Sequence, residues 1–273
     1  MSQEFAMRIF ALSSLTLAAL ACAPAHAAEA YIGYDGFNAA SGALNPGLWN
    51  QLEIGREVKS GFAVLRQRNL GQQISNSGTW SIIHSLPFDE PWRITQMKAD
   101  ITVMSASATA CAANTSPTEA NARLTGAFFN SGAPTPGNAT GDIGAQIRVV
   151  QRSDSTAPLG TLQVEGLAYR CTNADCTSSV LVGSLQNMGT VAVGSMVRAQ
   201  VEWDQPNKRF LLTRDSNPAV SIAYTDSDSA GPGNPVKSLS LRQLLANCFS
   251  GPRTQADLEA RFDNVAVNAS GTP

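Results

Sequence analysis

Two acidic residues, Glu202 and Asp204, come closest to the spacing of a catalytic carboxylate pair. Residues two apart on a β-strand point to the same face of a sheet. Hydrolysis of a glycosidic bond with retention of configuration needs two such carboxyl groups about 5 Å apart. The pair stands at the end of an expected hairpin, and Pro206 follows it. We therefore expect no catalytic residue in this chain, with Glu202 and Asp204 as the alternative assignment.

The sequence contains few residues suited to other kinds of catalysis. His84 is the one histidine after the N-terminal segment, so a serine or cysteine nucleophile would have to use it. No Gly-x-Ser-x-Gly motif accompanies His84, and a lone histidine on a strand is usually structural or at the surface. A lyase with a tyrosine or histidine base stays open as an alternative, although no spacing in the sequence indicates one.

The cysteines indicate disulfides. Cys111, Cys171, Cys176 and Cys248 follow the N-terminal segment, and an even number in an exported chain favours bridges. Turn-like residues favour a Cys171–Cys176 bridge, which leaves Cys111–Cys248 as the second. A zinc site is the rival interpretation, but His84 is the only histidine that could join it.

The N-terminal segment has the features of a signal peptide. Arg8 precedes an apolar run over residues 9–23, and Ala25-His26-Ala27 has the small-x-small pattern of a cleavage site. The apolar run is too short for a membrane span. We expect an exported protein, periplasmic or extracellular. Lipoprotein anchoring through Cys22 is a less favoured alternative.

The length and composition of the chain after residue 27 fit one β-rich domain. Residues 1–27 are the expected signal peptide, and residues 28–273 are the expected single domain. The formal net charge of −2, with 15% charged residues, gives no clustered basic surface for nucleic acid or anionic membrane.

Period-two alternation predicts many short strands. Apolar residues alternate with polar ones over 97–103 and again over 197–203, where a hairpin connection follows. The polar stretch 105–121 is most simply a long loop anchored at Cys111. Residues 239–249 fit either a helix or a strand. A dozen or so short strands in one domain favour a β-sandwich or barrel.

The two ends of the domain have complementary strands. Residues 31–37 alternate aromatic and small residues, and Leu48-Trp49 follows a turn, while residues 258–268 form the last strand. Pairing the terminal strands would protect sheet edges. The apolar register of the last strand shifts by one residue at Asp263-Asn264, which predicts a β-bulge there, with Asp263 beside the first strand.

These end motifs, Tyr34-Asp35-Gly36-Phe37 with Leu48-Trp49 and Phe262-Asp263-Asn264-Val265, resemble those of the concanavalin A-like lectin/glucanase superfamily. The hairpin at Trp203-Asp204 with Phe210 is also similar. The resemblance implies a jelly-roll β-sandwich of two curved antiparallel sheets, with saccharide on the concave face in many relatives. The Glu-x-Asp-x-Glu motif of the superfamily's glucanases is absent.

The resemblance also suggests binding residues. A terminal-strand carboxylate helps bind calcium in some relatives, and by position this would be Asp263, with Asp35 opposite. The structural alternative is a bulge or side-chain cap at Asp263. Exposed rings stack on sugars, and Trp80, Trp92 and Tyr169 are the candidates, although each also fits a core position.

The sequence therefore predicts an exported, non-catalytic domain that binds polysaccharide or cell-surface glycan, or serves another surface interaction, with one structural calcium ion. A divergent polysaccharide-cleaving enzyme and a purely structural exported domain are the alternatives.

Overall fold

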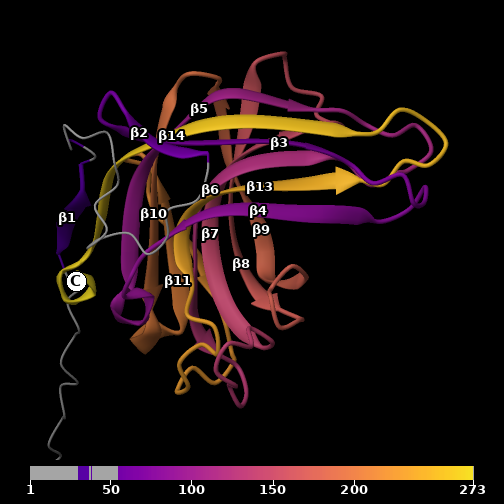
Figure 1. Ribbon diagram of the computed structural model, residues 1–273. Helices are drawn as coiled ribbons and strands as arrows, with labels where there is room; N and C mark the ends of the chain where they lie inside the picture. Colours follow the sequence, from indigo (N-terminus) through magenta and orange to yellow (C-terminus); the bar gives the residue numbers. More distant parts are fainter. Residues whose placement is uncertain (1–29, 37, 39–54, 273) are drawn as a thin grey trace, which may run out of the picture.

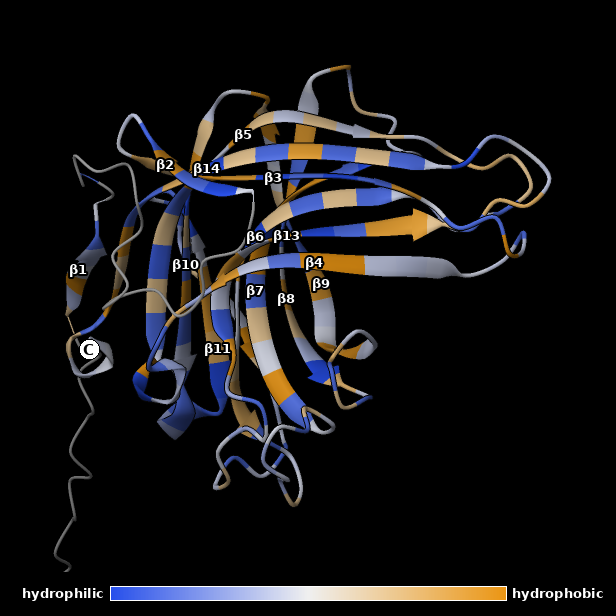
Figure 2. Ribbon diagram, viewed as in Figure 1, coloured by the Kyte–Doolittle hydropathy of each residue, from blue (hydrophilic) through white to orange (hydrophobic). Residues whose placement is uncertain are grey.

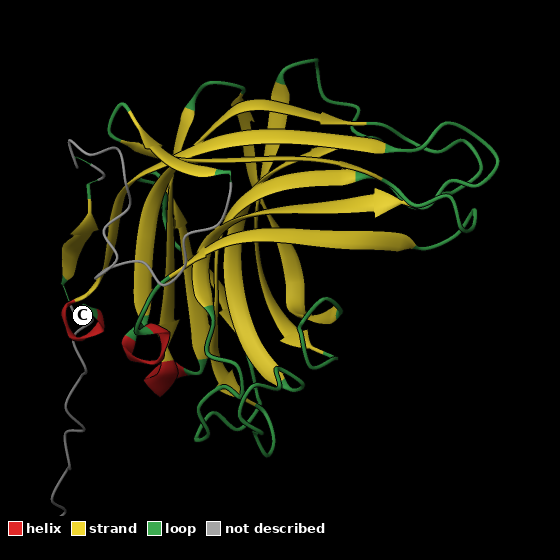
Figure 3. Cartoon of the chain, viewed as in Figure 1, coloured by secondary structure: helices red, strands yellow, loops and turns green. Residues whose placement is uncertain are grey.

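The computed structural model describes residues 30–36, 38 and 55–272. The expected signal peptide, Cys22 and the Leu48-Trp49 motif lie outside the described residues. The described chain is almost entirely β-structure (Figure 3). The elements are β1 (Tyr31–Asp35), β2 (Arg56–Lys59), β3 (Phe62–Leu70), β4 (Thr79–Pro87), η1 (Pro91–Arg93), β5 (Gln96–Ala108), β6 (Glu119–Asn130), β7 (Asp142–Arg152), β8 (Thr161–Cys171), β9 (Ser179–Ala192), β10 (Met196–Asp204), η2 (Gln205–Asn207), β11 (Arg209–Arg214), β12 (Val220–Ala223), β13 (Lys237–Ala246), β14 (Gln255–Asn268) and η3 (Ala269–Gly271).

The strands form two antiparallel sheets that pack face to face (Figure 1). The eight-stranded sheet has the order β12-β11-β10-β5-β14-β3-β2, with β1 added on β14. The six-stranded sheet has the order β4-β13-β6-β7-β8-β9. In each sheet some neighbours are consecutive strands and others come from distant parts of the chain, such as β5 with β14 and β4 with β13. This arrangement confirms the predicted jelly-roll sandwich of two antiparallel sheets.

The core lies between the two sheets, where alternate side chains of each strand meet. Figure 2 shows the alternation along the strands as bands of hydrophilic and hydrophobic residues. Burial of apolar surface in this layer is the main stabilising contribution. A group of aromatic side chains packs in this layer, where the Trp203 ring stacks on Phe129 with 5.5 Å between the ring centroids. The indole N–H of Trp203 donates to the Tyr224 hydroxyl at 2.8 Å, so its polar atom is satisfied.

The terminal strands pair as predicted, and the bulge is present. Tyr31 of β1 lies opposite Asn268 of β14. The register between β14 and β5 shifts between Asp263 and Ala266, and Asn264 has a φ of 48°. The extra residue lets Phe262 and Val265 both face the core, since an unbroken strand would turn Val265 outward.

Two sequence predictions change in the structure. The stretch 105–121 is not one long loop, because β5 continues to Ala108 and β6 begins at Glu119. The polar residues Glu119 and Asn121 belong to a strand whose alternate residues, Ala120 and Ala122, are buried in the core. Residues 237–246, which include most of the ambiguous segment, form strand β13.

Both predicted disulfides are present. Cys171–Cys176 closes the connection between β8 and β9, and Cys111–Cys248 joins the β5–β6 loop to the segment after β13. The described residues include no helix with the length and apolarity to cross a membrane.

The two disulfides should differ in their contribution to stability. Cys111–Cys248 spans 137 residues of sequence and Cys171–Cys176 spans 5. The chain-entropy model gives roughly 5 and roughly 2 kcal/mol respectively. We expect Cys111→Ser/Cys248→Ser to lower the free energy of unfolding by more than Cys171→Ser/Cys176→Ser does, as measured by urea denaturation. Equal losses would contradict the assignment of the long bridge as the main covalent constraint.

Candidate functional site

The outer face of the six-stranded sheet contains a hollow of about 300 Å³. Strand alternation places the side chains, since Leu124 of β6 faces the core while Arg123 and Thr125 face outward. The loops after β6, β8 and β12 complete the walls. The lining residues are Ile83, Ser85, Arg123, Thr125, Ala127, Ala139, Gln146, Arg148, Leu167, Tyr169, Cys171, Asp175, Cys176, Ser179, Leu181, Asn234, Val236, Ser238 and Arg242. We call this hollow the groove.

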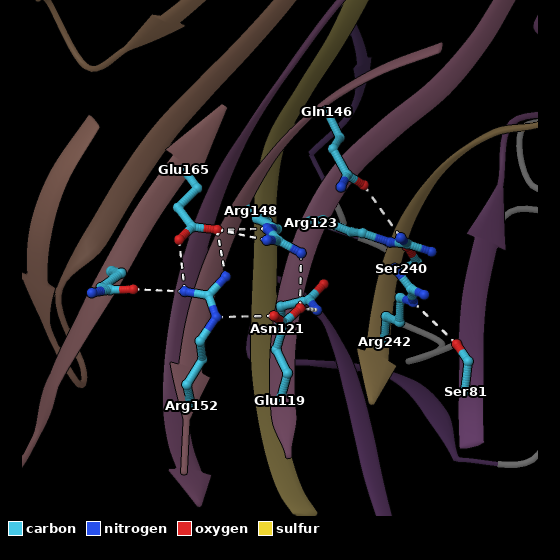
Figure 4. Close-up of polar contacts among 11 residues, drawn as sticks. Ser81, Glu119, Asn121, Arg123, Gln146, Arg148, Arg152, Glu165, Ser240 and Arg242 are labelled. Atoms are coloured by element: carbon cyan, nitrogen blue, oxygen red, sulfur yellow. Dashed lines mark hydrogen bonds and ion pairs between the residues drawn. The ribbon is translucent and has the colours of Figure 1, made fainter. Parts of the chain in front are cut away.

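Four charged residues form a closed network beside the groove (Figure 4). Arg148 of β7 contacts Glu119 at 2.8 Å and Glu165 at 2.7 Å. Arg152 lies four residues further along β7 on the same face. It contacts Glu119 at 3.1 Å and Glu165 at 2.6 Å. Each carboxylate is therefore shared by both arginines. The network links β6, β7 and β8 across the face of the sheet.

The network favours the ionised form of Glu165. Burial opposes the ionisation of Glu165, but hydrogen bonds and charge from Arg152 and Arg148 outweigh it and lower the pKa of Glu165. Burial also opposes charge on Arg152, yet Glu165 and Glu119 raise its pKa. A carboxylate whose pKa is lowered is a poor proton donor, so Glu165 does not suit general acid catalysis.

Two further arginines face the groove without carboxylate partners. Arg123, which is 8% exposed, donates from Nε to Ser240 at 2.9 Å and from Nη1 to Gln146 at 3.2 Å. Arg242 donates from Nε to Ser81 at 3.0 Å. Among the described residues, neither guanidinium has a carboxylate at ion-pair distance.

Burial and mutual repulsion act on these two arginines. Burial, together with the nearby charge of Arg242, lowers the pKa of Arg123 to about 9, so Arg123 remains protonated at neutral pH. Burial also lowers the pKa of Arg242. Arg123 lies directly opposite Arg148 on the neighbouring strand, a like-charge pairing that costs stability. Arg123 thus has a buried charge with no ion-pair partner among the described residues.

Tyr169 lies in the groove, and a glycine makes room for it. The Tyr169 hydroxyl and Thr125 share a hydrogen bond of 3.1 Å. A Cβ at Gly144 would lie 2.6 Å from the Tyr169 ring and 2.4 Å from the carbonyl oxygen of Gly126. Glycine at 144 therefore lets the ring lie close over β7. Burial raises the pKa of the Tyr169 hydroxyl, which keeps it protonated.

The other two aromatic candidates lie elsewhere. Trp80 is 37% exposed at the start of β4 and lines a different hollow with Leu70 and Arg253. Trp92 is 62% exposed in η1. Neither ring lines the groove. Of the three predicted stacking residues, the structure brings only Tyr169 to it.

Glu202 and Asp204 lie on the eight-stranded sheet, away from the groove. Burial and the charge of Asp204 raise the pKa of Glu202. Burial opposes the ionisation of Asp204, but Arg209 at 2.7 Å and Asn207 outweigh it and lower the pKa of Asp204. The two carboxyl groups thus share one face with opposite pKa shifts.

The predicted calcium residues line different hollows. Asp35 lines a hollow with Asn264, whereas Asp263 lines another with Asp100. Asn264 is the bulge residue that lies in the hollow beside β1, and its side-chain amide donates to Asp100 at 2.8 Å. No three histidine, cysteine or carboxylate side chains form a metal-ligand cluster in the described part of the chain. A calcium ion at Asp35 and Asp263 stays a prediction.

Apart from Tyr169, the groove residues were not predicted from the sequence, although the sequence contains their signal. Polar residues alternate with small apolar ones at Glu119, Asn121, Arg123 and Thr125 of β6. On β8, Glu165 is bound by Arg148 and Arg152. Charged residues of both signs that alternate with buried apolar residues on two adjacent strands indicate a polar sheet face.

Comparisons with known proteins find similarity at the level of structure. No family model and no curated protein matches the chain. LamAcat from Zobellia galactanivorans is 11% identical, with a TM-score of 0.40, over 84% of this chain and 95% of that one. The Bacillus licheniformis β-glucanase is 12% identical, with a TM-score of 0.35, over 87% and 98%. The Emp47p carbohydrate recognition domain is 12% identical, with a TM-score of 0.33, over 83% and 98%.

Stability should distinguish the paired arginines from the unpaired ones. Arg148→Met leaves Glu119 and Glu165 with one arginine between them, and we expect it to cost about 3 kcal/mol or more of unfolding free energy. Arg123→Met removes a buried charge that has no carboxylate partner, so we expect a change within about 1 kcal/mol, or a gain. Urea denaturation with both disulfides intact measures the two changes. Equal losses would show that Arg123 is needed for the fold itself.

Proposed function

We propose that this protein is an exported, non-catalytic jelly-roll domain that binds glycan in the groove of its six-stranded sheet. The observation that carries the proposal is the placement of planar hydrogen-bonding side chains, namely Arg123, Gln146 and Tyr169, along one hollowed sheet face. Sugar hydroxyls are both donors and acceptors, and such side chains satisfy them in fixed directions.

Apolar side chains in the same hollow support a saccharide ligand. Ile83, Leu167 and Leu181 line the groove from β4, β8 and β9. Ligand sites combine apolar walls with a few directed polar groups, and hollows of 300 Å³ and above are typical for small ligands. The C–H faces of a pyranose ring suit these walls, and its hydroxyls suit the polar row between them.

The charge network supports a binding role over hydrolysis. Glycoside hydrolysis by two carboxyl groups needs one of them protonated before the bond breaks. Glu165 has its pKa lowered by the arginines, and each of its oxygens accepts hydrogen bonds from them. The two disulfides and the N-terminal apolar segment support export to an oxidising compartment.

Glycan binding is tested with the purified protein on a glycan array and by affinity electrophoresis in polysaccharide-containing gels. We expect retention by at least one polysaccharide, and loss of that retention in Gln146→Ala, which removes an acceptor and a donor at the groove. Gln186→Ala on β9 is the matched control, because the Gln186 side chain hydrogen-bonds only to Ser184 among the described residues. Absence of binding to every carbohydrate would favour the purely structural alternative.

Polysaccharide cleavage is the second candidate, and one observation favours it. Glu202 and Asp204 have opposite pKa shifts on one strand face, a pattern found in acid–base pairs. Release of reducing ends or unsaturated sugars that disappears in Glu202→Gln would support this alternative and contradict the non-catalytic assignment. We expect no release from the wild-type protein.

A further inference from the structure

The carboxylates on the face of the groove do not pair with Arg123 or Arg242. On the outer face of β6, β7, β8 and β13 stand four arginines and three carboxylates, 4 − 3 = +1. With Asp175 at the rim, the formal sum is 4 − 4 = 0. The third carboxylate, Asp142, accepts hydrogen bonds from the Asn130 amide and from the backbone N–H groups of Gly233 and Asn234.

The glutamates are already committed to other partners. Glu119 accepts hydrogen bonds from Arg148, Arg152 and Asn121, and Glu165 accepts from both arginines. They cannot also pair with Arg123 without giving up contacts within the network. Asp175 is likewise bound to Thr177 through side chain and backbone.

Arg123 and Arg242 retain hydrogen-bond donors that no described residue accepts. A guanidinium has five N–H donors. Arg123 uses two, toward Ser240 and Gln146, which leaves 5 − 2 = 3, and Arg242 uses one, toward Ser81, which leaves 5 − 1 = 4. Ser240 and Gln146 fix the Arg123 side chain in place. The guanidinium groups are therefore preorganised and face the hollow.

A buried, preorganised guanidinium without a carboxylate partner is suited to binding an anion. Burying such a charge lowers stability unless an anion compensates it. Arginine binds planar carboxylates and sulfate-like groups through paired N–H donors, and such charge-assisted bonds are the strong ones. The compensating anion must come from outside the described chain, at the groove, where both arginines are accessible.

We propose that the groove binds an acidic saccharide whose carboxylate or sulfate group accepts hydrogen bonds from Arg123 and Arg242. This inference rests on the proposed function and names its ligand class. The anionic group lies between β6 and β13, since Arg242 is opposite Asn121 and Arg123 is opposite Ser240 in the strand register. The sugar ring extends toward Tyr169 and the apolar wall of β8 and β9.

The test uses three polysaccharide probes with the full purified protein. Polygalacturonate supplies carboxylates, dextran sulfate supplies sulfate esters, and unsulfated dextran supplies neither. We expect binding to at least one acidic polymer, weakening as salt is raised, and none to dextran. Binding to polygalacturonate alone identifies a uronate ligand, and binding to dextran sulfate alone identifies a sulfate ester.

Variants connect the binding to the two arginines. Arg123→Gln/Arg242→Gln should weaken binding of the acidic polymer at least tenfold, since two charge-assisted contacts are lost. Arg242→Lys keeps the charge and loses the planar fork, so an intermediate loss is expected. Arg68→Gln is the control for a change of net charge, because Arg68 on β3 has a 72% exposed side chain and pairs with Asp257 away from the groove.

Competition on the wild-type protein needs no variant to fold. Where polygalacturonate is the polymer that binds, free galacturonate should displace it, and galactose, which differs in lacking the carboxylate, should not. Binding to acidic polymers that survives Arg123→Gln/Arg242→Gln would overturn the inference. Binding only to neutral glycans would overturn it while leaving the proposed function intact, and no binding to any glycan would overturn both.

Discussion

The doubly bridged ion-pair network of Glu119 and Glu165 with Arg148 and Arg152 is the interaction on which the outer face of the six-stranded sheet depends. Its side chains are only 7–16% exposed, so removing one partner would leave charge buried without compensation. The network spans β6, β7 and β8, and both carboxylates accept hydrogen bonds from Arg148 and Arg152. Neither carboxylate can pair with another cation without giving up contacts within the network.

That exclusion determines the character of the groove. Because the network occupies both carboxylates, Arg123 stands opposite Arg148 with only neutral partners, Ser240 and Gln146. Natural proteins tolerate such local cost at functional sites and compensate for it elsewhere. Here the compensation is a large apolar layer between two sheets and a disulfide, Cys111–Cys248, that connects distant parts of the chain.

Much of the fold was predictable because it follows from local rules. Period-two alternation defined β5 and β10, the one-residue shift of apolar register located the bulge at Asp263-Asn264, and the cysteine count with a turn gave both disulfides. Strand β6 was partly missed, because Glu119 and Asn121 look like loop residues unless their partners on β7 and β8 are known.

The site was less predictable than the fold because it is made by long-range pairing. The Arg123 side chain is held by Ser240, which is more than a hundred residues away in the chain. Among the described residues, Arg123 has no carboxylate partner because Glu165 is already paired with Arg152. Tyr169 was among the predicted aromatic residues and does line the groove, whereas Trp80 and Trp92 lie elsewhere. Sequence spacing identifies which residues share a strand face, but not which strands are neighbours.

The most direct test of this account is the pKa of Glu165, measured by following the side-chain carboxyl carbon of ¹³C-labelled protein in an NMR pH titration. The bridged network predicts a value below the usual 4.5 of a glutamate. A value well above 4.5 would show that Glu165 is protonated more easily than a free glutamate. That result would contradict the ionised network and reopen an acid-catalytic role for this face of the sheet.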